Sequence, residues 1–301
     1  MKKHLHRLSL EKGDFLPVLL LLPTLFIVAV VLIIPFFYSI YMSFFDYRIG
    51  AAQSMDRFLG FANYVRLFND PVVWQSTRNT IAFSFLAISG DIVFGTLIAV
   101  LLLKLRPKFG GFLRAVLLTP LLVSPIIIGL IWKFMFDPAW GTVYWILGWF
   151  GLGIADFPGV TSSSTALLAV VIAHWWQVIP FVMLVVTAGL VSIPQELYEA
   201  AHMDGAGEFY KFFKISLPLL ANVYMVVLVI AGVDTLKVFD IIFALTGGGP
   251  ANSTISLSIY AHQIAFRAND LGYAAVISNF TMLLTFLIFG IIFARFNMKR
   301  D

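Results

Sequence analysis

Residues 192–218 of this 301-residue chain read SIPQELYEAAHMDGAGEFYKFFKISLP and lie between two long apolar runs. Charged groups are costly inside a lipid bilayer, so they face water, a cavity or a partner. This segment is therefore expected to form a polar loop outside the membrane, and the two neighbouring runs must end where it begins and ends. Its six charged side chains are Glu196, Glu199, Asp204, Glu208, Lys211 and Lys214.

The same stretch predicts two short helices. Ser192 and Gln195 fit a capping box, and Pro194 is tolerated in a first helical turn. Gly205 and Gly207 predict the end of this helix. A second helix should follow before Pro218 opens the next apolar run. We expect it to turn Phe209, Phe212 and Phe213 to one side and Lys211 and Lys214 toward water.

The composition is that of a polytopic membrane protein. Hydrophobic residues make up 60% of the chain, charged residues only 12%, and the mean hydropathy is +0.93. A soluble domain has about 25% charged residues. Apolar runs long enough to cross a bilayer as helices occur at 16–38, 79–103, 113–135, 165–190, 217–245 and 273–294. The fold class expected is therefore all-α with six transmembrane helices.

The distribution of Lys and Arg predicts the orientation. Basic residues cluster in the N-terminus, in two alternate loops and in the C-terminus. Because positive charge is retained on the cytosolic face, both termini and the loop at 192–218 are expected to be cytosolic. The clusters are Lys2, Lys3, Arg7 and Lys12; Lys104, Arg106, Lys108 and Arg114; Lys211 and Lys214; and Arg295, Lys299 and Arg300.

The sequence lacks the residues that several kinds of chemistry require. The chain has no cysteine, which excludes a disulfide framework and a thiolate site. The five histidines show no metal-ligand spacing, so no metal site is expected. No glycine-rich loop ends in the Lys and Ser or Thr that ATP binding requires. We therefore expect a non-enzymatic chain that binds no cofactor itself. The first apolar run is too long for a signal-peptide core and is interpreted as a retained helix.

The loop also resembles a known family element. Glu199-Ala200-Ala201, then Gly205, then Ile215-x-Leu217-Pro218 resembles the EAA loop of the membrane subunits of binding-protein-dependent ABC importers. In that family the loop is the coupling helix, which sits in a cleft of the ATPase subunit. The resemblance implies a coupling role for Glu199, Ala200, Ala201, Asp204, Gly205, Ile215, Leu217 and Pro218. The alternative is an ordinary solvated cytosolic loop.

Other segments resemble the carbohydrate-type subfamily, which includes maltose and glycerol-3-phosphate permeases. The similarity runs from about residue 15 to residue 295. It is carried by Phe61, Asn63 and Tyr64, by Asn79-Thr80, by the LTGGGP turn at 245–250, and by Gly272-Tyr273-Ala274-Ala275.

This resemblance implies a type I ABC importer permease fold. The domains would be a cytosolic basic tail at 1–14, one transmembrane permease domain at 15–295 with its coupling loop at 192–217, and a cytosolic tail at 296–301. The partners implied are a second permease subunit, usually a different homologous chain, two ATPase subunits that hold ATP and Mg, and an external solute-binding protein. The location implied is a bacterial or archaeal cytoplasmic membrane, crossed several times.

Candidate residues for the solute pathway lie on both sides of the loop. Trp176, Gln177 and Phe181 offer aromatic faces and an amide, which suit sugar rings. Trp175 is interpreted as an aromatic-belt residue, and Asp91 as a contact between helices.

In the fifth run, Asp234 and Lys237 stand three residues apart on one helical face, so they either pair or line the pathway. In the second case Asp234 and Thr235 would bind sugar hydroxyls.

The function expected is half of the translocation pathway of an ATP-driven importer for a carbohydrate or related polyol. An ion-coupled secondary transporter is the alternative, because Asp91, Asp234 and Lys237 could serve ion coupling. A membrane scaffold without transport activity is a third possibility.

Overall fold

The structure is a computed structural model that describes residues 15–50 and 57–297, all helical apart from turns and two isolated bridges. The expected tail at 1–14 and residues 298–301 lie outside the described residues. In chain order the helices are α1 (Phe15–Val28), η1 (Ala29–Ile33), α2 (Ile34–Ser43), α3 (Ala62–Asn69), α4 (Pro71–Leu103), α5 (Pro107–Leu117), η2 (Thr119–Leu122), α6 (Pro125–Met135), α7 (Thr142–Gly148), η3 (Gly159–Thr161), α8 (Ala166–Val191), α9 (Gln195–Met203), α10 (Glu208–Lys211), η4 (Phe212–Ser216), α11 (Leu217–Leu219), α12 (Ala221–Leu236), α13 (Asp240–Leu245), α14 (Leu257–Phe266) and α15 (Leu271–Asn297).

Four helical segments of the described chain are long and apolar enough to cross a membrane: 19–43, α4, α8 and 271–295. Two further candidates are bent pairs of helices, at an angle of 99° in 107–135 and of 64° in 208–236. Counting each bent pair as one span gives the six spans that the sequence predicts. The fifth run is shorter than expected, since α12 ends at Leu236 and α13 is a separate helix.

Prolines account for the irregular spans. In the first span, Pro35 lacks a backbone N–H, and the π-helix η1 lies just before it. In the third, Ser124 has an extended conformation because the residue before a proline, here Pro125, disfavours the helical one. The Gln177 side-chain amide donates to the carbonyl oxygen of Val123 at this break, at 3.1 Å. Tertiary contacts thus satisfy backbone groups that the bend releases.

The core forms where α4 packs along α8. A Cβ on Gly95 would lie 2.8 Å from the Val182 side chain, and one on Gly90 would overlap the Trp175 ring. The Trp175 indole N–H donates to the Ala87 carbonyl at 3.0 Å. The Trp175 ring thus fills the space above Gly90 between two helices. Its interpretation as an aromatic-belt residue stays a prediction.

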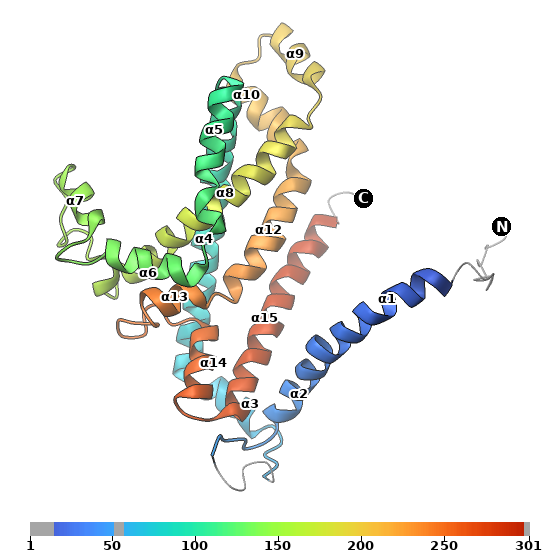
Figure 1. Ribbon diagram of the computed structural model, residues 1–301, viewed down its shortest axis with the longest axis vertical. Helices are drawn as coiled ribbons and strands as arrows, with labels where there is room; N and C mark the ends of the chain where they lie inside the picture. Colours follow the sequence, from blue (N-terminus) through green and yellow to red (C-terminus); the bar gives the residue numbers. More distant parts are fainter. Residues whose placement is uncertain (1–14, 51–56, 298–301) are drawn as a thin grey trace.

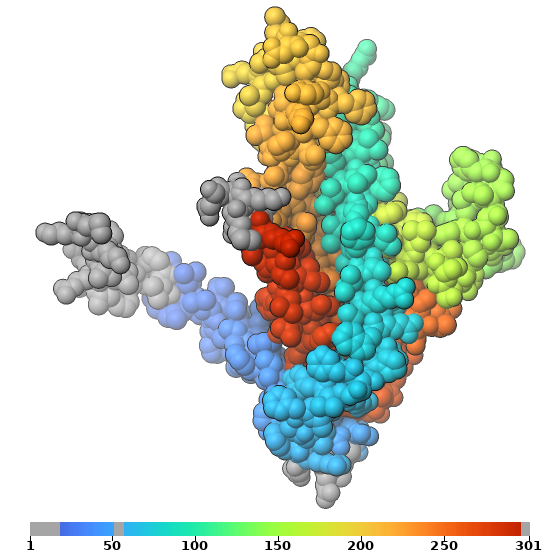
Figure 2. All heavy atoms as spheres, turned by 180° about the vertical axis from the view of Figure 1, so that it is seen from behind, coloured from blue at the N-terminus to red at the C-terminus, as the bar shows by residue number. Residues whose placement is uncertain are grey.

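The first span leans away from the other helices (Figures 1 and 2). Its α2 end packs on α15, whereas the described side chains from Leu19 to Tyr41 are exposed or half-buried. At one end of the molecule, α9 stands clear of the helical body, and α3 lies at the opposite end.

Candidate functional site: a polar hairpin and an apolar groove

The polar hairpin, residues 192–218, begins differently from the prediction. The Ser192 hydroxyl donates to the Gly189 carbonyl at 2.7 Å, and Pro194 occupies the N-cap position of α9 without a side-chain cap bond. The capping box is therefore wrong. Since α8 continues to Val191, Ser192 is its C-cap residue, and its hydroxyl serves the end of α8 rather than the start of α9.

The end of α9 follows the prediction at Gly205. This residue has a φ of +79°, a left-handed conformation that favours glycine. The Gly205 N–H donates to the His202 carbonyl at 3.0 Å, and the Ala206 N–H donates to the Ala201 carbonyl at 2.9 Å. This pair of bonds is a Schellman motif, which satisfies the last carbonyls of a helix and reverses the chain sharply.

The second half of the hairpin corrects a prediction. Phe209 is 83% exposed, whereas the Lys211 side chain is only 14% exposed and lies 2.7 Å from Glu208. The ion pair holds Lys211 against the chain. The π-helix η4 then follows, in which Phe212 is half-buried, Phe213 is exposed, and Lys214 is exposed as expected.

The residues expected to couple to an ATPase lie mainly at the surface of this end of the molecule. Glu199, Ala200, Asp204 and Gly205 are exposed, as are Leu217 and Pro218, while Ala201 and Ile215 are half-buried. Large apolar side chains beside them are also exposed, Met203 by 86%. An exposed apolar surface with scattered charge fits contact with another protein.

The candidates for the solute pathway are not brought together. Trp176 is 42% exposed and meets Trp132 edge to face, whereas Gln177 is buried and bonded to Val123. Phe181 is half-buried beside the packed α4–α8 interface.

On α12, the alternative of pairing is confirmed, with Lys237 Nζ 3.1 Å from Asp234 Oδ1, although both side chains are largely exposed. Thr235 is buried, and its hydroxyl donates to the Gly232 carbonyl at 2.9 Å.

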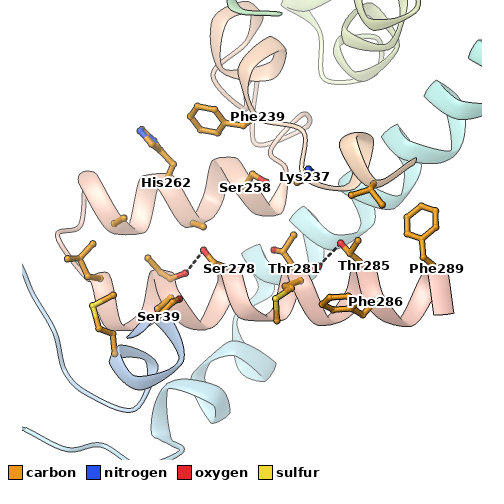
Figure 3. Close-up of a pocket in the computed structure, with 18 of the residues that line it drawn as sticks. Ser39, Lys237, Phe239, Ser258, His262, Ser278, Thr281, Thr285, Phe286 and Phe289 are labelled. Atoms are coloured by element: carbon orange, nitrogen blue, oxygen red, sulfur yellow. Dashed lines mark hydrogen bonds between the residues drawn. The ribbon is translucent and has the colours of Figure 1, made fainter. Parts of the chain in front are cut away.

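A groove of about 980 Å³ that the sequence did not predict lies between α2, α12, α14 and α15 (Figure 3). Most of its surface is apolar. Lys237 and His262 line it, together with the hydroxyl groups of Ser258 and Ser278. The residues come from elements as far apart in the chain as α2 and α15, so no local pattern could have revealed it.

A cluster of polar side chains at the α3 end of the molecule was also missed. The Asp70 carboxylate accepts from the hydroxyls of Tyr260 and Tyr273, at 2.6 and 2.7 Å, and from the Val72 N–H at the start of α4. Arg66 pairs with Asp270 at 2.8 Å and stacks on the Tyr273 ring. This cluster joins α3, α4, α14 and α15 at one end of the molecule.

The hydrogen bonds shift the acidity of Asp70. Burial raises the pKa of Asp70, but the bonds from Tyr260, Tyr273 and the backbone outweigh it and lower the pKa overall. Burial and the Asp70 carboxylate raise the pKa of Tyr260, so its hydroxyl remains protonated and donates.

Comparison with known proteins places the chain in a family. Residues 91–300 match the family described as "Binding-protein-dependent transport system inner membrane component". The chain belongs to this family. It is therefore a transport permease and a multi-pass membrane protein, which confirms the family expected from the sequence. The coupling role of Glu199-Ala200-Ala201 and its neighbours stays a prediction.

Similar proteins align with nearly the whole chain. The trehalose/maltose transport system permease protein MalF of Thermococcus litoralis is 38% identical over 94% of each chain. The sulfoquinovosyl glycerol transport system permease protein SmoG of Agrobacterium fabrum is 34% identical over 89% of this chain and 86% of its own.

A solved structure supports the fold. A chain of a bacterial ABC transporter involved in the import of the acidic polysaccharide alginate superposes with a TM-score of 0.79, at 23% identity and over 96% of each chain. The expected permease fold is confirmed.

Proposed function

We propose that this permease forms half of the translocation pathway of an ATP-driven importer for a carbohydrate or a related polyol. The observation that carries this proposal is the hairpin at 192–218, which lies at one end of the molecule with Glu199, Ala200 and Gly205 at its surface. Support for the solute class comes from relatives whose names refer to trehalose, maltose and sulfoquinovosyl glycerol.

The complete transporter would contain further chains of three kinds. These are a second permease, usually a different homologous chain, two ATPase subunits that bind ATP and Mg, and an external solute-binding protein. Both termini and the hairpin lie in the cytosol. When the ATPase subunits close on ATP, they move the hairpin. The helices that flank the hairpin, α8 and α12, then move with it, so that the solute pathway opens to one side of the membrane or the other.

The ion-coupled alternative has weaker support. Lys237 Nζ lies 3.1 Å from Asp234 Oδ1 and His174 Nε2 lies 3.1 Å from Asp91 Oδ2, so each of the three proposed ion-coupling groups already has a partner in the chain. The family, moreover, is defined by its dependence on a binding protein.

The test uses the complete transporter in proteoliposomes, with uptake of radiolabelled maltose, trehalose and glycerol 3-phosphate measured alongside ATP hydrolysis. Wild-type uptake should require ATP and the binding protein. Glu199→Lys should abolish uptake while the subunits still insert in the membrane. Lys108→Glu, a charge reversal on the other cytosolic segment, is the matched control. Normal uptake by Glu199→Lys, or uptake without ATP, contradicts the proposal.

A further inference from the structure

One hydrogen bond ties α9 to the segment that leads into α12. The hydroxyl oxygens of Tyr198 and Ser216 lie 2.8 Å apart. Tyr198 is a half-buried residue of α9, and Ser216 is a buried residue of η4. In the part of the chain that the structure describes, no other side chain of α9 hydrogen-bonds to another element. The rest of α9 turns mainly outward, with Leu197 43% exposed and Met203 86% exposed.

The two ends of α9 are joined to the rest of the chain by short segments outside the helices. On one side, residues 192–194 are a short connection outside both α8 and α9. On the other side, Gly205 and Gly207 lie in the connection between α9 and α10, and a Cβ added at either glycine would meet no atom within 4 Å. A helix connected in this way can swing about its ends unless a side chain holds it.

Ser216 is well placed to pass on a displacement. Its carbonyl accepts from the Leu220 N–H at 2.9 Å, at the break before α12. Leu220 and Val223 in turn pack on Gly189 of α8, where a Cβ would lie 2.6 and 2.8 Å from them. Close packing of this kind leaves little room for independent movement. The Tyr198 hydroxyl therefore contacts the point where the hairpin, α12 and α8 meet.

We propose that Tyr198 is a positioning residue for coupling, which acts through Ser216 to make α9 move as one body with the start of α12. This inference rests on the coupling role of the hairpin proposed above. In that role, a force on Glu199 and Ala200 reaches the membrane through the Tyr198–Ser216 bond. Without the bond, α9 swings on residues 192–194 and on Gly205, and part of its movement is lost.

Tyr198→Phe keeps the ring and removes the hydroxyl, and Ser216→Ala removes the partner. Each variant should lower the amount of solute imported per ATP hydrolysed by roughly two- to tenfold, the range for loss of one hydrogen bond. Hydrolysis of ATP should continue. Since both changes remove the same contact, the double variant should be no worse than the more severe single variant. Tyr41→Phe, which removes an exposed hydroxyl from α2, is the matched control.

The measurement is made on the assembled transporter in proteoliposomes, with uptake and hydrolysis recorded on the same sample. An unchanged ratio of uptake to hydrolysis in either single variant overturns the inference, and so does a double variant in which the two losses multiply. Glu199→Lys is included to separate the two proposals. If it abolishes uptake while Tyr198→Phe is normal, only the role of Tyr198 fails. If it transports normally, the coupling role of the hairpin fails as well.

A second measurement does not depend on how well these variants fold. The chain has no cysteine, so spin labels can be attached at Met203→Cys on α9 and Val226→Cys on α12, both exposed positions. Pulsed electron paramagnetic resonance gives the distance between the two spin labels with and without ATP. A distance that stays constant while the transporter changes state supports movement as one body. A distance that changes between the two states overturns it.

Discussion

Asp91 of α4 and His174 of α8 face each other inside the membrane-spanning core, with Asp91 Oδ2 3.1 Å from His174 Nε2. Asp91 is completely buried, and its other carboxyl oxygen has no hydrogen-bond partner among the described residues. The interpretation of Asp91 as a contact between helices is confirmed. A buried acid in a span needs a partner, and here His174 supplies it.

Loss of His174 should destabilise the permease. His174→Phe leaves the Asp91 carboxyl group buried without a partner, at a cost of about 1–3 kcal/mol. The double variant Asp91→Leu/His174→Phe removes both polar groups and should recover part of that loss. Thermal unfolding of the purified complex in detergent measures the stability of the single and the double variant. A His174→Phe transporter that unfolds at the wild-type temperature would show that the pair does not stabilise the core.

Gly205 should be sensitive to strain rather than to bulk. Its φ of +79° is unfavourable for other residues, although a Cβ at this position would meet no other atom within 4 Å. Gly205→Ala should therefore cost about 1 kcal/mol and weaken coupling, while Gly205→Asn, which tolerates this conformation, should do so less. Gly207→Ala is the control, because Gly207 has a φ of −72° and open surroundings. The amount of solute imported per ATP hydrolysed distinguishes the three variants. Equal defects in all three variants would refute an origin in backbone strain.

The cluster around Asp70 predicts that the stability of the permease depends on pH. A carboxyl group whose pKa is lowered in the folded state stabilises it above the ordinary pKa, here 3.8, and this contribution is lost as pH falls through the lowered value. The unfolding temperature of the wild type should therefore exceed that of Asp70→Asn at neutral pH, and the two should converge below about pH 3.8. A difference that persists or grows in acid contradicts the assignment.

The orientation of the chain can be tested with single cysteines. Because the native chain has none, Met203→Cys in α9 and Ala251→Cys in the turn after α13 each provide one thiol at an exposed position. A maleimide that does not cross membranes should label Ala251→Cys in intact spheroplasts and Met203→Cys only in inverted vesicles. The opposite pattern would place the hairpin outside the cell.

The sequence predicted the spans well and the local contacts of the hairpin less well. Runs at 165–190 and 273–294 became α8 and α15 with shifts of a few residues, because helix length in a bilayer depends on local hydropathy. Gly205 ended α9 as expected, since left-handed backbone is a local property of glycine. Ser192 failed as a cap and Lys211 failed to face water, because the length of α8 and the pairing with Glu208 decided their partners.

The sequence by itself determined the membrane character of this protein, the position of its polar hairpin and the family resemblance, because all three depend on residues that are neighbours in the chain. Only the tertiary structure decided which side chains meet. Asp91 and His174 are 83 residues apart, and Tyr198 and Ser216 are on separate helices. Such pairs form when helix packing brings distant segments together, and no local spacing records which partner each side chain will find.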